Sequence, residues 1–443
     1  MSEPIFVGRA YEQQCYQALL KGDVRWLLIV TGQGGIGKST LLRRFREITP
    51  AGTAVVSLNF ADIALRTDAL AILGELAEQV KQYCQPKQLH MFEKSLLQGR
   101  NELAIQSQMH ETIIAREHAV VQGNQLSMSG IEQRRQIREK VRKAFNDLLD
   151  TLRLATLVLL LDTCEWLNEA ESSEVGQWML QSVLPKLHER LCQKRRQCVA
   201  VIASRFLLDL AAIDEQERRH LVLLVLERAA VDDYLRHIGM QDRALHQRVY
   251  DLTHGQALCV SIIATLWQER PFSIADLPLM QEQFTEQALL KFVGERILDK
   301  RLKSPFRELT RYGIVLRSFN LPTLQAVFPD LHIEYEQFSQ FIRYPYIEAV
   351  GNRRHATHGL LREILAEEIR EQEPEQWQIY HKRAQKYFTT LQPPQSDRYY
   401  HAIELSQEEG MSDWWDAIQS ASFRRDQEEF TGQSHLNFDS LKL

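Results

Sequence analysis

Short runs of consecutive apolar residues alternate with helical stretches over the amino-terminal half of the chain. Five of these runs predict strands, at Trp26–Val30, Ala54–Leu58, Leu157–Leu161, Cys198–Ala203 and Leu221–Leu226. Nearly continuous apolar runs are typical of strands buried on both faces, and strands that alternate with helices indicate a mostly parallel α/β sheet. Apolar residues at helical spacing after the first strand predict a helix with one face on the sheet. They are Leu41, Leu42, Phe45 and Ile48.

The pattern changes between Pro86 and about residue 136, where the chain is polar and rich in Gln. We expect residues 86–136 to form a helical insertion that projects from the sheet domain. Gly123-Asn124 and Ser127–Gly130 predict a flexible break between its two helices. A solvated helical excursion without a function of its own is the alternative.

The carboxyl-terminal half is mostly helical and contains one hairpin signal at Gly351-Asn352. Two predicted helices come first and two short extended runs then flank this dipeptide, namely Phe306–Leu316, Leu321–Phe328, Tyr346–Val350 and Arg353–His358. Gly-Asn between extended runs is typical of a type II′ hairpin. Helices followed by one hairpin predict a winged-helix unit.

Composition places the chain among ordinary globular proteins. Hydrophobic residues make up 44% and charged residues 25% of the 443 residues. The apolar runs are far shorter than the roughly twenty residues that span a membrane, and Met1–Phe6 does not resemble a secretory signal. We therefore expect a cytoplasmic protein without a membrane partner.

Charge and cysteine content exclude two further classes. The net charge of −5 argues against a chain built mainly to coat nucleic acid. The six cysteines contain no C-x-x-C pair, which argues against a disulfide framework and a zinc site.

The strongest chemical signal directly follows the first predicted strand. Residues 32–40 match the pattern G-x-x-x-x-G-K-[ST], in full Gly32, Gln33, Gly34, Gly35, Ile36, Gly37, Lys38, Ser39 and Thr40. Glycines let backbone N–H groups close around phosphates, and the helix that follows adds the positive end of its dipole. Lys38 is expected to reach the β- and γ-phosphates of ATP, and Ser39 to bind Mg²⁺.

Two further strand ends carry polar side chains suited to such a site. Asp162 ends the apolar run Leu157–Leu161 and is expected to hold Mg²⁺, while Glu165 is a candidate general base. Arg205 follows Cys198–Ala203 at the edge where parallel sheets bind ligands, and its guanidinium suits a γ-phosphate. The alternatives are a helix N-cap for Asp162, a surface position for Glu165 and a surface ion pair for Arg205.

Together these motifs resemble the STAND class of P-loop NTPases, of the NB-ARC or AP-ATPase type. The class includes apoptotic protease activators, plant disease-resistance proteins and bacterial antiphage or signalling ATPases. The segments that carry the resemblance are Phe6-Val7-Gly8-Arg9, the P-loop, Leu161–Glu165 and Ala203-Ser204-Arg205. The resemblance implies nucleotide contacts from Val7, Gly8 and Arg9.

Two downstream segments extend the resemblance. Gly255-Gln256-Ala257-Leu258 is similar to a family segment that meets the adenine, which implies nucleotide contacts from Gly255, Ala257 and Leu258. His355–Glu363 is similar to the winged-helix segment whose histidine, here His358, contacts the ADP β-phosphate in the resting state. The chain departs from the family at Ala257, usually proline, and at Gly359, often aspartate.

The predicted fold class is α/β: a P-loop NTPase parallel-sheet domain followed by a helical domain, a winged-helix domain and a short helical tail. The expected boundaries are residues 1–226, 227–294, 295–370 and 371–443. The tail fits the start of a helical repeat array.

The resemblance implies an ATP/ADP switch that hydrolyses ATP slowly and forms a homo-oligomer in its ATP state. Few residues precede Phe6 or follow the predicted winged helix, so we expect the effector or sensor on another protein, unless the sequence is a fragment. A DNA-engaging AAA+-like ATPase is the first alternative, because basic residues cluster at Lys300, Arg301, Lys303, Arg307, Arg311 and Arg317. A small-molecule kinase is the second, although no lid or acceptor site is evident.

Overall fold

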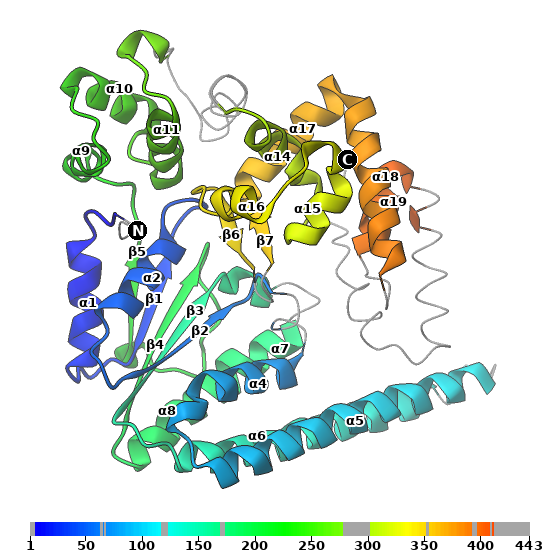
Figure 1. Cartoon of the computed structure of the whole chain (residues 1–443). Helices are drawn as coiled ribbons and strands as arrows, with labels where there is room; N and C mark the ends of the chain where they lie inside the picture. Colours follow the sequence, from blue (N-terminus) through cyan, green and yellow to red (C-terminus); the bar gives the residue numbers. More distant parts are fainter. Residues whose placement is uncertain are drawn as a thin grey trace. The chain divides into compact units, whose positions relative to one another are not determined.

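The computed structural model describes most of the chain, and Figure 1 shows it as a cartoon. The described residues are 5–62, 65, 68–116, 123–168, 173–277, 302–350, 354–391, 397–407 and 410–411. They fall into two compact units, which we name the loop unit and the sheet unit. The loop unit takes its residues from Met1–Gln13, Gly32–Arg44 and Val222–Gln407, and the sheet unit from Gln14–Thr31, Phe45–Leu221 and Glu408–Leu443.

Five strands form one sheet in the order β2-β3-β4-β1-β5. They are β1 (Leu27–Thr31), β2 (Ala54–Asn59), β3 (Thr156–Asp162), β4 (Gln197–Ser204) and β5 (Arg218–Val222). β2 pairs with β3, β3 with β4 and β4 with β1, each time in parallel. The first four strands lie within one residue of their predicted ends, so the predicted parallel sheet is confirmed.

The fifth strand differs from its prediction. We expected a strand at Leu221–Leu226, buried on both faces, whereas β5 begins at Arg218 and ends at Val222. Among the described strands, β5 lies at the edge of the sheet and has only β1 as a neighbour. An edge strand is partly exposed and needs no continuous apolar run. Leu221 is the one buried residue of β5, and Leu224 beyond it is 67% exposed. Most of the apolar run is therefore a loop segment.

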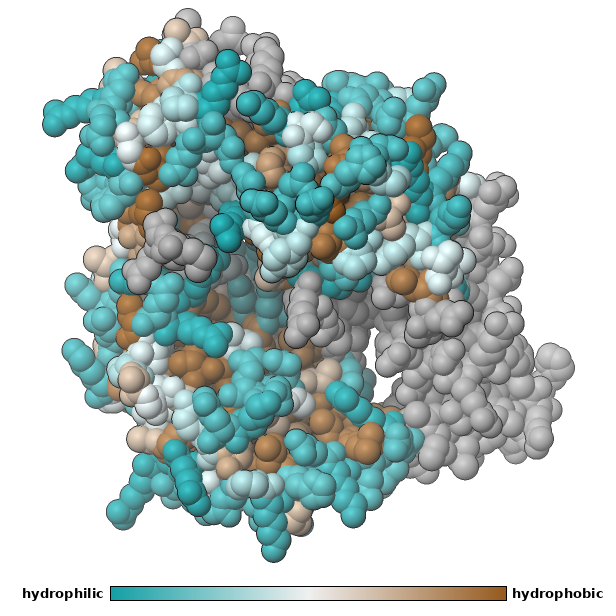
Figure 2. Space-filling model, in the orientation of Figure 1, coloured by the Kyte–Doolittle hydropathy of each residue, from teal (hydrophilic) through white to brown (hydrophobic). Residues whose placement is uncertain are grey.

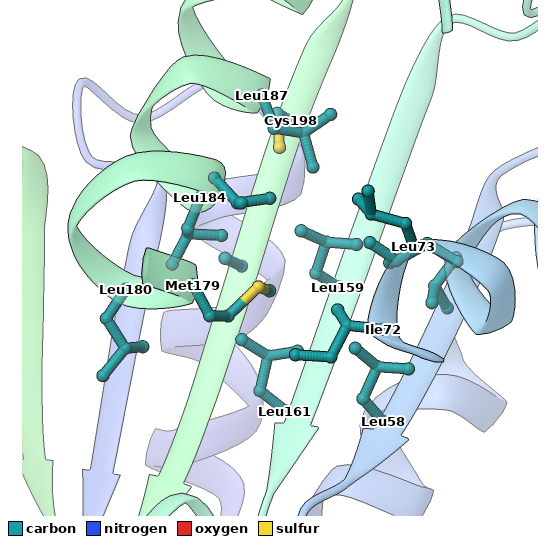
Figure 3. Close-up of a cluster of buried hydrophobic side chains, with 14 of the residues drawn as sticks. Leu58, Ile72, Leu73, Leu159, Leu161, Met179, Leu180, Leu184, Leu187 and Cys198 are labelled. Carbon is teal, nitrogen blue, oxygen red and sulfur yellow. The ribbon is translucent and has the colours of Figure 1, made fainter. Parts of the chain in front are cut away.

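One face of the sheet is covered by helices that share its largest buried cluster. They are α4 (Ala69–Val80), α6 (Gly123–Asp150), α7 (Ser173–Trp178) and α8 (Leu184–Gln193). Every second residue of a strand points to the same face. In Figure 3, Leu58 of β2 and Leu161 of β3 meet Ile72 of α4. These contacts hold the strand ends, and the residues that follow them, in place.

The second face is buried as well, since the alternate strand residues, such as Val158 and Val199, are fully buried. Two helices flank β1 along the chain, α1 (Ala10–Leu20) and α2 (Lys38–Ile48). Tyr16 of α1 stacks on Phe45 of α2, with ring centroids 4.3 Å apart. The residues predicted for the packed face of α2 are buried or, for the last, half-buried: Leu41, Leu42, Phe45 and Ile48.

The predicted insertion consists of two long helices, α5 (Pro86–Arg116) and the first part of α6. They lie side by side in Figure 1, and Phe92 packs on Phe145 where they meet. The break predicted at 123–130 is wrong, because α6 begins at Gly123 and continues through these residues. A glycine costs a helix only about 1 kcal/mol, and the neighbouring Gln, Leu and Met favour helix. The connection at 117–122 lies outside the described residues.

The carboxyl-terminal part of the loop unit is helical around one continuous core. Its helices are α9 (Arg228–His237), α10 (Arg243–Thr253), α11 (Ala257–Glu269), α14 (Phe306–Tyr312), α15 (Leu321–Val327), α16 (Tyr335–Phe341), α17 (Gly359–Gln372), α18 (Pro374–Thr390) and α19 (Asp397–Leu405). Before α17, β6 (Ile347–Ala349) and β7 (His355–Thr357) pair antiparallel. This pairing confirms the predicted hairpin, although its turn at 351–353 lies outside the described residues.

Hydrophilic residues dominate the face of the molecule shown in Figure 2, and apolar residues are scattered among them. Within the part of the chain that the structure describes, every helix is too short or too polar to cross a membrane.

Candidate functional site

The loop between β1 and α2 consists of residues 32–37, and α2 begins at Lys38, as the motif predicts. Gly35 has a φ of +69°, in the left-handed region that favours glycine. A Cβ atom at this position would lie 2.7 Å from Nε2 of Gln256 and 3.0 Å from Cβ of Leu258. The backbone conformation therefore favours glycine, and a side chain at this position would have to displace Gln256 or Leu258.

Lys38 closes the loop on itself. The residue is 9% exposed, and its Nζ donates hydrogen bonds to the carbonyl oxygens of Gly32 at 2.6 Å and Gln33 at 2.9 Å. An ammonium on a flexible stem can transfer from these carbonyls to a phosphate oxygen. Ser39 and Thr40 are exposed residues in the first turn of α2.

The next three carbonyl groups of the loop accept hydrogen bonds from outside it. The bonds are Gln256 Nε2 to Gly34 O at 3.3 Å, Leu258 N to Gly35 O at 3.0 Å and Arg9 Nη2 to Ile36 O at 3.2 Å. In a trans peptide, the N–H of the following residue points away from the carbonyl. The N–H groups of residues 35–37 are therefore directed to the opposite side, where they can form a cradle for an anion with the N-terminus of α2.

Arg9 belongs to the predicted segment Val7-Gly8-Arg9, which precedes α1. Besides Ile36, its Nη2 donates to the carbonyl oxygen of Leu224 at 2.6 Å. Burial lowers the pKa of the Arg9 guanidinium, and the neighbouring Glu12 opposes that shift. Arg9 thus joins the loop to the chain segment after β5. Direct nucleotide contacts from Val7, Gly8 and Arg9 stay a prediction.

The segment 255–258 packs directly on the loop. Gly255 has a φ of +76°, and its carbonyl oxygen accepts from the N–H of Leu226 at 2.8 Å. A Cβ atom at Gly255 would lie 2.0 Å from the Leu226 oxygen, so the turn requires glycine. A Cβ atom at Gly37 would lie 3.7 Å from Cβ of Ala257. The segment therefore reaches the loop, and its contact with adenine stays a prediction.

The polar residues at the strand ends gather at one edge of the sheet. Strand β4 lies between β1 and β3, and Ser204 is level with Thr31 in the parallel register. Asp162 is the last residue of β3. Because neighbouring strands lie about 5 Å apart, Asp162 and Arg205 leave the sheet as close neighbours.

Glu165 and Arg205 pair with each other. The Glu165 carboxylate accepts from the backbone N–H of Arg205 at 3.2 Å, and its second oxygen lies 3.2 Å from Nε of Arg205. The Glu165 side chain is 11% exposed and that of Arg205 is 45% exposed. Glu165 is thus largely enclosed at the strand ends, and Arg205 forms the ion pair considered as its alternative, while the roles of both residues in hydrolysis stay predictions.

Thr163 and Asn59, to which the motifs gave no role, form hydrogen bonds beside Asp162. The N–H of Thr163 donates to Oδ1 of Asp162 at 2.9 Å, and its hydroxyl donates to Oδ1 of Asn59 at 2.8 Å. Thr163 has a φ of +58°, which is unfavourable for a β-branched residue and is typical of functional sites. Asn59 lies far from Thr163 in sequence, so no local pattern could have shown this contact.

His358 lies at the start of α17, next to the hairpin. The residue is buried, its N–H donates to the carbonyl oxygen of Tyr346 at 2.7 Å, and its Nε2 is 3.7 Å from Oε1 of Glu348. Both His358 and the loop 32–37 belong to the loop unit. A contact of His358 with a nucleotide stays a prediction.

Two of the six basic residues proposed to bind DNA, Arg307 and Arg311, have acidic partners. Arg311 lies 2.9 Å from Glu368 and 2.7 Å from Glu373, and Arg307 lies 2.7 Å from Glu308. Lys300 and Arg301 lie outside the described residues. These ion pairs weaken the cluster as a surface for phosphates.

Similarity to known proteins agrees with the motifs. Residues 5–202 match the family model of the AAA ATPase domain. A Signal Transduction ATPase with Numerous Domains (STAND) protein with a tetratricopeptide repeat sensor, from Pyrococcus horikoshii, has a similar fold, with a TM-score of 0.52 and 12% sequence identity. The similarity covers 94% of this chain and 51% of that one, so this chain spans about half of that protein's length.

A second solved structure, Cdc6p from Pyrobaculum aerophilum, has a TM-score of 0.37 and 13% identity over 83% of this chain and 98% of that one. No curated protein sequence matches the chain.

Proposed function

We propose that the chain is an ATP/ADP-dependent molecular switch, because residues 5–202 match the AAA ATPase domain and the fold is similar to that of a STAND protein. It binds ATP, hydrolyses it slowly and uses the nucleotide state to control its own conformation and assembly.

One observation carries the binding part of this proposal. The carbonyl groups of residues 32–36 are all engaged, by Lys38, Gln256, Leu258 and Arg9. The N–H groups of residues 35–37 then face the opposite side at the start of α2, which is the arrangement that binds phosphate groups. Lys38 supplies the positive charge beside them.

Mg²⁺ accompanies the nucleotide in this proposal, with Ser39 and Asp162 as its protein ligands. Hydroxyl and carboxylate oxygens are the hard ligands that Mg²⁺ prefers. The exposed position of Ser39 and the position of Asp162 at the end of β3 fit these roles. Bound Mg²⁺ neutralises charge on the β- and γ-phosphates.

Hydrolysis involves Glu165 and Arg205. Arg205 stabilises the γ-phosphate, because a planar guanidinium suits phosphate oxygens. Glu165 polarises the attacking water as general base. Their mutual ion pair supports slow intrinsic turnover, since Glu165 has to leave Arg205 before it can act.

The switch itself is proposed to involve His358. In the ADP state, His358 contacts the β-phosphate and holds the winged-helix domain of residues 295–370 against the nucleotide. ATP releases this domain, and the chain assembles into a homo-oligomer. An effector or sensor protein reads this change, and the sensor repeats named for the Pyrococcus horikoshii protein illustrate one such part.

Replacement of the P-loop lysine tests nucleotide binding. Lys38→Ala is expected to weaken ATP affinity about 10- to 100-fold, since a hydrogen bond to a charged group contributes about 1.5–3 kcal/mol. Titration of the purified protein with a fluorescent ATP analogue measures the affinity, and release of labelled phosphate measures turnover. Lys81→Ala, a change at an exposed lysine paired with Glu78, is the matched control. Unchanged ATP affinity in Lys38→Ala would remove the nucleotide site.

A further inference from the structure

Gln256 lies where the loop 32–37 meets helix α11. The residue precedes Ala257, the first residue of α11, and is 6% exposed. Its Oε1 accepts from the N–H of Cys259 at 2.7 Å, which caps the helix, and its Nε2 donates to the carbonyl oxygen of Gly34 at 3.3 Å. One side chain thus caps α11 and binds the loop.

The two bonds fix the orientation of the Gln256 amide. Its oxygen can only accept and its nitrogen can only donate. The reverse orientation would place the amide NH₂ against the N–H of Cys259 and the amide oxygen against the Gly34 carbonyl. The cap therefore determines that the NH₂ group faces the loop.

A backbone bond from the same helix end adds to this contact. The N–H of Leu258 donates to the carbonyl oxygen of Gly35 at 3.0 Å. This N–H is one of those that a helix leaves without an internal partner in its first turn. Two successive loop carbonyls, of Gly34 and Gly35, are therefore held by the start of α11.

We infer that Gln256 is a positioning residue for the diphosphate group of a nucleotide. By holding the Gly34 carbonyl against α11, it turns the N–H of Gly35 toward the side where the β-phosphate binds. The Gln256 side chain makes both hydrogen bonds at once, so the cap of α11 and the orientation of the phosphate-facing N–H group are coupled. This inference rests on the nucleotide binding proposed above, and it adds a residue to which the motifs give no role.

The test separates the two functions of the side chain. Gln256→Ser retains a good N-cap, because serine is a preferred capping residue, but its side chain is too short to reach Gly34. Asp242→Ala is the matched control. Asp242 caps α10 through the N–H of Ala244 at 2.8 Å, and its removal weakens a neighbouring helix without touching the loop.

We expect Gln256→Ser to melt close to the wild type without nucleotide and to bind ADP about 3- to 10-fold more weakly, as the loss of one hydrogen bond predicts. The affinity for AMP should change by less than about 2-fold. AMP lacks the β-phosphate, so it does not receive the hydrogen bond that the variant weakens. Asp242→Ala should melt earlier and bind ADP as the wild type does. Isothermal titration of the full chain with ADP and AMP provides these values.

Three results would overturn the inference while leaving the proposed function intact, provided that the wild type binds ADP and Lys38→Ala binds it more weakly. These are wild-type ADP affinity in Gln256→Ser, equal losses for ADP and AMP, or an equal loss of ADP affinity in Asp242→Ala. A wild type that binds no ADP would overturn the inference together with the proposed function.

Discussion

At the scale of the residue, the proposed hydrolysis depends on the pair of Glu165 and Arg205. Both oxygens of the Glu165 carboxylate are directed at Arg205, one to the backbone N–H and one to Nε. A carboxylate occupied in this way is a poor base for water. In the proposed mechanism, a γ-phosphate that attracts the Arg205 guanidinium breaks this ion pair and frees Glu165 to act.

Glu165→Gln tests this role. The amide keeps an oxygen that can accept from Arg205 but cannot take a proton from water, so ATP should stay bound while turnover falls about 10²-fold or more. Filter binding of labelled ATP and phosphate release measure the two quantities. Glu174→Gln, at an exposed ion pair with Arg138, should behave as the wild type. Wild-type turnover in Glu165→Gln would leave Glu165 a structural role only.

At the scale of the element, helices α18 and α19 share two buried histidines. Nδ1 of His381 and Nδ1 of His401 are 3.0 Å apart, so one ring donates to the other and both are neutral. Burial lowers the pKa of His381 to about 3 and lowers that of His401 well below its ordinary value. The positive charges of Arg362 and, for His401, Arg317 add to this effect.

Acid should therefore loosen this helix pair. In the unfolded chain both rings take up protons near pH 6.5, so their contribution to stability is complete above that pH and is lost as the pH falls toward the folded pKa. At pH 5 the loss is about 2 kcal/mol for each histidine. Urea unfolding at pH 7.5 and pH 5 measures it.

The double variant His381→Phe/His401→Leu should show less of this pH dependence, and His332→Gln, at an exposed histidine, should keep all of it. If the double variant and the wild type lose equal stability between the two pH values, the buried pair is not the cause.

The sequence predicted correctly those strands that are buried on both faces, because a continuous apolar run indicates such burial directly. β3 and β4 are buried on both faces and were found from their apolar runs, whereas β5 at the sheet edge was misplaced. The start of α6 was also misplaced, because glycine and serine at 123–130 suggested a break that the helix overrides. The motif G-x-x-x-x-G-K-[ST] located loop 32–37 and Lys38, because all of its residues are adjacent in the sequence. Gln256 was missed because its bond to Gly34 joins residues far apart in the chain.

At the scale of the whole molecule, the predicted parallel α/β sheet with the P-loop motif and the helical carboxyl-terminal region are confirmed, and the fold is similar to that of a STAND protein, while the winged-helix domain stays a prediction. The loop unit contains both the loop 32–37 and the segment with His358. Moving a two-state equilibrium from 1:99 to 99:1 requires about 5.5 kcal/mol of preferential binding. The γ-phosphate with Mg²⁺ has to supply most of this preference if ATP and ADP are to select different states.

The most direct test determines the nucleotide bound to the purified protein and its molecular mass by light scattering, before and after addition of ATP with Mg²⁺. We expect ADP and a single-chain mass before, and ATP with a multiple of that mass after. His358→Ala should lose ADP faster and assemble at lower ATP concentration. Exchange of ADP for ATP without any change in mass, in the wild type and in His358→Ala alike, would contradict nucleotide control of assembly.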